Sequence, residues 1–151
     1  MKIFLISLGC DKNRVDSEEM LGLLKGAGFS FCDDEAEADI IIINTCCFID
    51  PAKEESIETI LAMARMKEYG NCKRLIVTGC MAERYKEEVL KELPEVDAIV
   101  GVKDLSKVLT AVAPELGEKF EQQPLGKQKR VITTPGHYEF LKIAEGCSKR
   151  C

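Results

Sequence analysis

Histidine and tryptophan are almost absent from this sequence of 151 residues, which contains one histidine and no tryptophan. A metal site built on several imidazole ligands is therefore excluded. The net charge is −5, so we expect no strong electrostatic attraction between this segment and nucleic acid. The longest purely apolar run is far shorter than the roughly 20 residues that cross a bilayer as a helix, and we expect no membrane association.

Cysteine is abundant, with eight residues: Cys10, Cys32, Cys46, Cys47, Cys72, Cys80, Cys147 and Cys151. Disulfide-rich scaffolds are small, loop-rich and secreted. This chain instead shows long helix and strand patterns, and the apolar run within residues 1–8 is too short for a signal peptide. We therefore predict a reducing, cytoplasmic location, where clustered cysteines indicate metal binding or redox chemistry.

Short apolar runs alternate with amphipathic segments along the first two thirds of the chain. The runs predict buried strands over residues 2–8, 39–44, 74–79 and 97–101, and a short edge strand over 29–32. The segments between them predict helices over residues 15–27, 50–68, 81–92 and 104–112. Asp16 or Ser17 is the expected N-cap of the first helix. This alternation predicts an α/β fold, a doubly wound, mainly parallel sheet with helices on both faces.

The composition changes at the end of this pattern, which we predict to be one domain, residues 1–113. Residues 114–136 are rich in proline and glycine and predict a linker, with a strand at 130–133. Residues 137–151 are the expected start of a further domain, and its apolar run 138–144 predicts a new strand.

Three cysteines share one position relative to the predicted strands. Cys10, Cys46 and Cys80 each follow a strand end by no more than two residues. The carboxyl ends of parallel strands lie on one edge of a sheet, so we expect the three thiols to converge, each before a helix whose N-terminus favours the thiolate. Three thiolates indicate a soft metal centre such as an iron–sulfur cluster, with one iron left open. The alternative is that these are small buried side chains, but three equivalent positions favour the metal.

The remaining cysteines of the first 113 residues are weaker candidates. Cys47 adjoins Cys46, and neighbouring side chains diverge, so both cannot easily reach one cluster; a thiol redox pair is an alternative. Cys72 precedes its strand and is expected near the opposite edge, and Cys32 ends the predicted edge strand. We expect these two to be packing or surface thiols.

A second cysteine motif, Cys147-x-x-x-Cys151, follows the predicted strand 138–144 through Glu145-Gly146. Its spacing alone is weak evidence. A third cysteine two residues beyond Cys151 would complete the loop that wraps three irons of a cluster, but residues 1–151 do not contain it.

Taken in order, these motifs resemble the radical S-adenosylmethionine methylthiotransferases. The resemblance depends on Gly9-Cys10, Asn13, Asp16-Ser17-Glu18, Asn44-Thr45-Cys46, Thr78-Gly79-Cys80 and Glu145-Gly146-Cys147-x-x-x-Cys151. It implies that an N-terminal α/β domain is followed by a radical S-adenosylmethionine barrel, of which only the first strand is present here. It also implies two [4Fe-4S] clusters: an auxiliary one on Cys10, Cys46 and Cys80, and a radical-generating one whose first two ligands are Cys147 and Cys151. Cys47 departs from the glycine usual at that position.

The implied reaction inserts sulfur and a methyl group into an unactivated C–H bond. S-adenosylmethionine supplies both a 5′-deoxyadenosyl radical and the methyl group, with an electron donor as a further partner. Lys12-Asn13 and His137-Tyr138 resemble the branch whose substrate is an aspartate of a small-subunit ribosomal protein. The alternatives are the branch that modifies a tRNA adenosine, and a non-catalytic α/β module for metal binding or thiol redox chemistry. Residues 1–151 alone are expected to be inactive.

Overall fold

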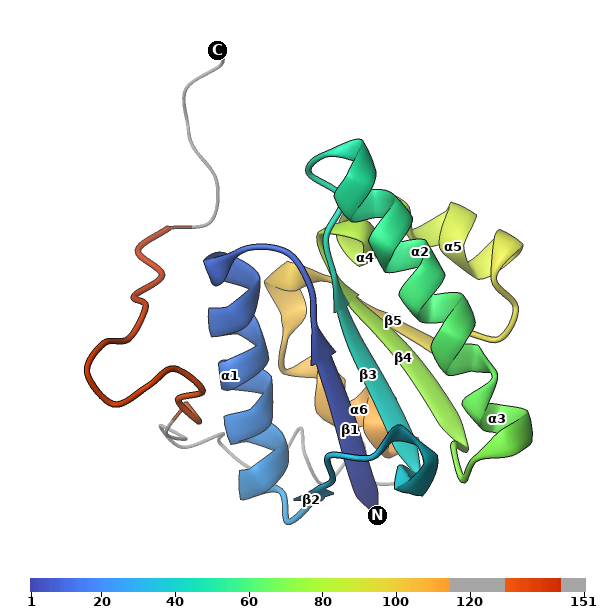
Figure 1. Ribbon diagram of the computed structural model, residues 1–151, viewed down its shortest axis with the longest axis horizontal. Coiled ribbons are helices and arrows are strands. Elements are labelled where there is room, and N and C mark those ends of the chain that lie inside the picture. The colour runs from blue at the N-terminus through green and yellow to red at the C-terminus, as the bar shows by residue number, and fades with distance from the viewer. Residues whose placement is uncertain (115–129, 145–151) are drawn as a thin grey trace.

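The computed structural model describes residues 1–114 and 130–144 (Figure 1). Its centre is a sheet in the order β2-β1-β3-β4-β5, in which every neighbouring pair is parallel. The strands are β1 (Lys2–Ser7), β2 (Ser30–Phe31), β3 (Ile40–Thr45), β4 (Arg74–Gly79) and β5 (Ala98–Val100). The central strand β3 is buried along its whole length, because helices cover both faces of a parallel sheet.

Helices lie on both sides of this sheet, as Figure 1 shows for α1 and α2. The helices are α1 (Asp11–Gly26), α2 (Asp50–Ala64), α3 (Met66–Tyr69), α4 (Cys80–Arg84), α5 (Lys86–Glu92) and α6 (Lys107–Val112), with short 3₁₀ turns η1 (Glu35–Glu37) and η2 (Val102–Asp104). One core layer joins α1 and α6 to the sheet, and the other joins α2, α4 and α5 to it. The predicted doubly wound α/β fold is confirmed. Within the described ranges, no helix has the length and apolar character needed to cross a membrane.

All four predicted helices differ from the structure in their bounds, two of them substantially. The first begins at Asp11 rather than at residue 15, and its N-cap is Cys10. Asp16 and Ser17 therefore lie inside the helix, where both side chains are buried and bond to other segments instead of capping it. The helix predicted over 81–92 is divided into α4 and α5 at Tyr85, whose ring lies against the Lys53 ammonium at 4.5 Å.

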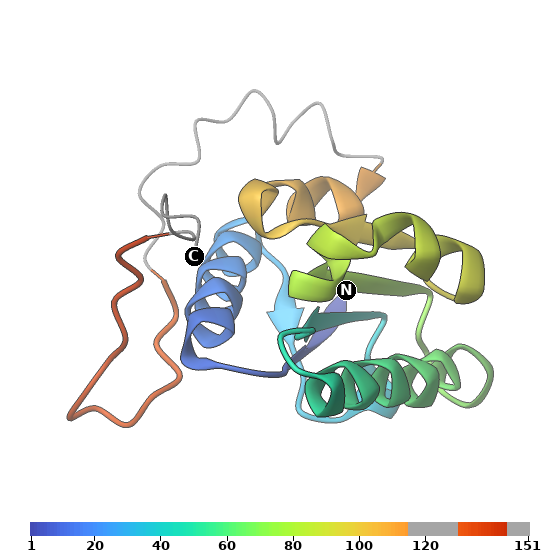
Figure 2. The same cartoon turned by 90° about the horizontal axis from the view of Figure 1, so that it is seen from above.

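The strands predicted over 130–133 and 138–144 are wrong. Residues 130–144, which we call the strap, form no strand. The strap runs beside α1 on the side away from the sheet (Figures 1 and 2). A strand needs a neighbour for its backbone groups, and here the strap lies against a helix. Leu141 and Ile143, whose apolar character suggested a buried strand, are 82% and 88% exposed.

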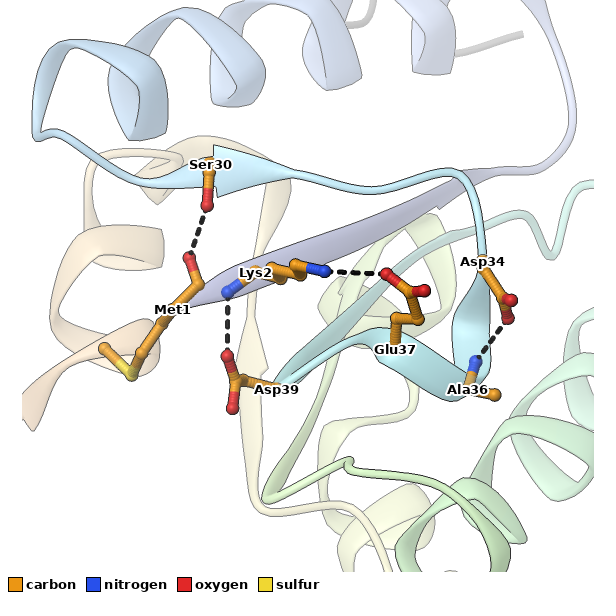
Figure 3. Close-up of polar contacts among 7 residues, drawn as sticks. All are labelled: Met1, Lys2, Ser30, Asp34, Ala36, Glu37 and Asp39. Carbon is orange, nitrogen blue, oxygen red and sulfur yellow. Dashed lines mark hydrogen bonds and ion pairs between the residues drawn. The ribbon is translucent and has the colours of Figure 1, made fainter.

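The amino edge of the sheet is closed by exposed polar contacts (Figure 3). The Lys2 ammonium lies 2.6 Å from the Glu37 carboxylate, and the Lys2 backbone N–H donates to Asp39 at 2.9 Å. Asp39 also pairs with Lys73 at 2.8 Å. These contacts fix the start of β1 beside the loop that leads into β3.

Candidate metal centre

The carboxyl edge of the sheet contains the point where the strand order reverses. Chain order runs outward from β1 to β2 on one side and from β3 to β5 on the other. In doubly wound sheets the crevice at this reversal is the usual ligand site. Cys10 follows β1 as the N-cap of α1, Cys46 follows β3, and Cys80 is the first residue of α4 after β4. The three cysteines therefore lie around this crevice.

One side chain, that of Asn13, connects the three cysteine-bearing segments. Its Nδ2 donates to the carbonyl of Leu8 at 3.0 Å and to the carbonyl of Thr45 at 2.9 Å. The Cys80 thiol donates to its Oδ1 at 3.7 Å. Asn13 is 1% exposed, so these bonds form away from competing water. The loop after β1, the end of β3 and the start of α4 are thus held at one place.

The glycine before Cys10 and the glycine before Cys80 allow these segments to approach closely. Gly9 and Gly79 both have positive φ, +87° and +94°. A Cβ atom on Gly9 would lie 2.6 Å from Cβ and 2.9 Å from Sγ of Cys46. A Cβ atom on Gly79 would collide with the Thr45 backbone and the Asn44 side chain. Glycine is therefore required at both positions.

A second layer of polar groups supports this arrangement. Asn44 Nδ2 donates to the Asn13 carbonyl at 2.7 Å and to Ser17 Oγ at 2.9 Å, and the Ser17 hydroxyl donates to Ser7 Oγ at 2.9 Å. Asn44 is fully buried. These bonds explain two of the sequence motifs: Asn44 and Ser17 bind the start of α1 to the ends of β1 and β3.

The backbone of Cys46 is held by Ser56, a residue that the sequence analysis did not identify. The Cys46 N–H donates to Ser56 Oγ at 3.0 Å, and the Ser56 hydroxyl donates back to the Cys46 carbonyl at 2.8 Å. Ser56 is fully buried on α2. Nothing in the sequence distinguishes it from any other serine in a helix, because its role depends on where α2 packs.

The cysteine thiols influence one another electrostatically. Burial raises the pKa of the Cys80 thiol, and the neighbouring Cys46, Cys47 and Cys10 raise it further, against a smaller opposing effect of Lys12. For Cys80 the net shift of the thiol pKa is therefore upward, opposite to the direction in which a helix N-terminus acts. Burial likewise raises the pKa of Cys47, and Arg84 opposes this effect. Crowded thiolates of this kind are stabilised when a metal neutralises their charge.

Space is available on both sides of the cysteines. A cavity of about 400 Å³ is lined by Cys47 and Cys80 together with Lys12, Phe48, Glu83, Arg84, Val102 and Lys103. A second cavity, of about 570 Å³, has Gly9 and Cys10 in its wall and lies between β1, α1 and strap residues Val131 and Thr133. Cys10 is exposed, whereas Cys46 and Cys47 are 5% and 8% exposed.

The donor set at the carboxyl edge fits an iron–sulfur cluster in its chemistry. Among residues 1–114 and 130–144, no group of three His, Cys, Asp or Glu side chains is arranged to hold a single metal ion. A cluster is larger, and each of its cysteines binds a different iron. The donors that meet at the carboxyl edge are thiols, the ligands of soft metals and clusters.

The other cysteines lie elsewhere or outside the description. Cys72 lies two residues before β4, near the amino edge as expected, and burial raises the pKa of its thiol. Cys32 follows β2 and is partly exposed. Cys147 and Cys151 lie outside the described residues, so their predicted role stays a prediction.

Comparison with known proteins agrees with the sequence motifs. The signature of the family described as "Uncharacterized protein family UPF0004" matches residues 2–101. A protein named "Ribosomal protein uS12 methylthiotransferase RimO" from Lachnoclostridium phytofermentans is 56% identical over 158 residues, covering 100% of this chain and 36% of the relative. Proteins of the same name from Sulfurihydrogenibium sp. and Sorangium cellulosum are 50% and 46% identical, covering 33% and 32% of those relatives.

The chain thus spans about a third of the length of the curated relatives it matches. The resemblance to the methylthiotransferases is confirmed. On its sequence signature and its similarity over the whole chain to these enzymes, the protein belongs to family UPF0004.

Proposed function

We propose that this chain is the auxiliary-cluster part of a radical S-adenosylmethionine methylthiotransferase that acts on a small-subunit ribosomal protein. The observation that carries the proposal is the convergence of Cys10, Cys46 and Cys80 at the carboxyl edge, where Asn13 contacts all three segments. In this proposal the three thiolates hold an auxiliary [4Fe-4S] cluster, and Cys147 and Cys151 are ligands of the radical-generating [4Fe-4S] cluster.

The chain's own residues have three tasks in this proposal. Asn13 and Asn44 fix the loops that present the ligands. Gly9 and Gly79 allow those loops to come together. The cavity beside Cys10 gives a substrate segment room to approach. When bound, the auxiliary cluster supplies an open iron site for sulfur.

The domain plan is part of the same proposal. Residues 1–113 form the N-terminal domain, residues 114–136 the linker, and residues 137–151 the start of the radical S-adenosylmethionine domain. The names of the relatives favour ribosomal protein uS12 as substrate and, with the sequence resemblance, an aspartate as target. An electron donor is a second partner, and the cytoplasm is the proposed location. No nucleic-acid or membrane partner is proposed for this segment.

Anaerobic reconstitution tests the auxiliary site directly. The 151-residue chain is incubated with iron and sulfide and studied by absorption and Mössbauer spectroscopy, beside Cys10→Ala/Cys46→Ala/Cys80→Ala. The control is Cys32→Ala/Cys72→Ala, which removes two thiols that do not lie at the crevice. We expect the chain and the control to bind the same auxiliary cluster and the triple variant to lose it. An auxiliary cluster that survives the triple change, or none in the unmodified chain, would refute the site. We expect no 5′-deoxyadenosine from this chain alone.

A further inference from the structure

Glu18 is a buried charged residue to which the proposed chemistry gives no role. It lies on α1 and is 1% exposed. One carboxylate oxygen accepts hydrogen bonds from the Thr133 N–H and the Thr133 hydroxyl, both at 2.7 Å. The other oxygen lies 3.1 Å from Arg130 Nε. The Glu18 carbonyl also accepts from the Val131 N–H at 3.1 Å. A single residue of α1 thus makes four contacts with the strap.

Two further residues of α1 hold the far half of the strap. The Asp16 carboxylate, also buried, pairs with Lys142, and the Arg14 guanidinium lies 6.0 Å from the centre of the Phe140 ring. Figures 1 and 2 show the strap following α1 on the side away from the sheet. The contacts at Glu18 and Asp16 are buried and charged, the strong class of hydrogen bond.

The helix that binds the strap also begins at a proposed cluster ligand. Cys10 is the N-cap of α1, and Glu18 follows it by eight residues, about 12 Å along a rigid helix. The residues between them include Asn13 and Ser17, which bind α1 to the carboxyl edge. In sequence, the strap ends at Ala144, three residues before Cys147.

We propose that Glu18 is a positioning residue, which clamps the strap to α1 and so tethers the chain, three residues before Cys147, to the helix that begins at Cys10. This inference rests on the proposed function, because only a two-cluster reaction needs the two groups of thiolates at a fixed separation. It also gives the Asp-Ser-Glu motif a physical meaning: Asp16 and Glu18 face the strap, while Ser17 faces the sheet.

The clamp depends on the negative charge of Glu18. Arg130 is only 19% exposed, so neutralising Glu18 leaves a partly buried cation whose remaining ion-pair partner is the exposed Glu139 carboxylate at 3.6 Å. Removing one member of a buried ion pair is costly because the remaining charge stays poorly solvated. The strap is then expected to leave α1, and its end at Ala144 is no longer held beside the helix that begins at Cys10.

The test uses the full-length protein, reconstituted anaerobically, with Glu18→Gln and the control Glu19→Gln. The control makes the same chemical change one residue along α1, at a partly exposed position. Hydrogen exchange of the Thr133 amide measures release of the strap. Spectroscopy measures both clusters. The product yield is the third measurement. We define it as the amount of uS12 methylthiolated per 5′-deoxyadenosine formed, a ratio that a general loss of folded protein does not change.

We expect Glu18→Gln to keep both clusters, to speed Thr133 exchange about tenfold, and to lower the yield on the order of 10²-fold, the cost of misplacing reacting groups. Glu19→Gln should change neither the rate of Thr133 exchange nor the yield. Arg130→Met removes the strap's member of the same ion pair. This variant should give the same result if Glu18→Gln does not fold. A released strap with an unchanged yield, or a yield that falls without release, overturns the inference.

If the unmodified protein binds no auxiliary cluster or makes no product, the proposed function itself fails, and the inference falls with it.

Discussion

The two edges of the sheet are both closed by polar contacts, but the contacts differ in kind. At the amino edge, Lys2 pairs with Glu37 and Lys73 pairs with Asp39 on the surface. At the carboxyl edge, Asn13 and Asn44 are 1% and 0% exposed and bond mostly to backbone carbonyls and hydroxyls. Exposed ion pairs contribute little because water and salt screen them, whereas buried bonds are costly to break. The edge that carries the cysteines is therefore the one whose geometry is fixed.

The largest contrast is expected between two glycines with similar backbone angles. Gly79, at the carboxyl edge, and Gly28, after α1 at the amino edge, have φ of +94° and +88°. Alanine at 79 adds a collision with the Thr45 backbone, whereas alanine at 28 meets nothing within 4 Å. We expect Gly79→Ala to lower the free energy of unfolding by about 4 kcal/mol and Gly28→Ala by about 1–2 kcal/mol. Urea denaturation of the 151-residue chain measures both, and equal losses would contradict the close approach at Gly79.

A smaller effect is expected from the central asparagine. Asn13→Asp keeps the size of the side chain but replaces the donor that bonds the Leu8 and Thr45 carbonyls with a carboxylate oxygen. We expect a loss of about 3 kcal/mol in unfolding free energy, because two buried acceptors lose their partner. Lys2→Met, which removes an exposed ion pair of the amino edge, serves as the comparison and should leave the urea midpoint unchanged. An Asn13→Asp protein as stable as the parent would show that this network is unimportant.

The smallest effect is a pH dependence at the amino edge. The hydrogen bond from Lys73, followed by that from the Lys2 backbone N–H, lowers the pKa of Asp39 below its ordinary value of 3.8. A lowered folded-state pKa means that the stabilisation is complete above the unfolded pKa and is lost as the pH falls through the folded one. Asp39→Asn should therefore give a flatter dependence of urea midpoint on pH below about 4. Identical slopes for the variant and the parent would contradict the assignment.

The sequence predicts the sheet well because buried parallel strands leave a strong signal. Runs such as Ile40–Ile43 are apolar on both faces, which few other structures require. The start of α1 was misplaced because Asp16 and Ser17 look like caps, and their actual partners are distant in sequence. The strap was misread as a strand because its apolar pattern does not reveal that a helix would be its neighbour.

The candidate site was predictable only in part. Cysteines at strand ends are visible in the sequence, since the fold class fixes which strand ends share an edge. Ser56 was not visible, because its bonds to Cys46 depend on the packing of α2. The same holds for the contact of Asn13 with Thr45, which joins residues far apart in the chain.

The wide spacing of Cys10, Cys46 and Cys80 along the chain has a consequence for biogenesis. Each cysteine follows a different strand, so an unfolded or half-synthesised polypeptide holds these three thiols apart, with no chelating site among them. Any metal centre at this edge must be loaded after β1, β3 and β4 have paired. On the proposed function, the sheet therefore forms before the auxiliary cluster is loaded.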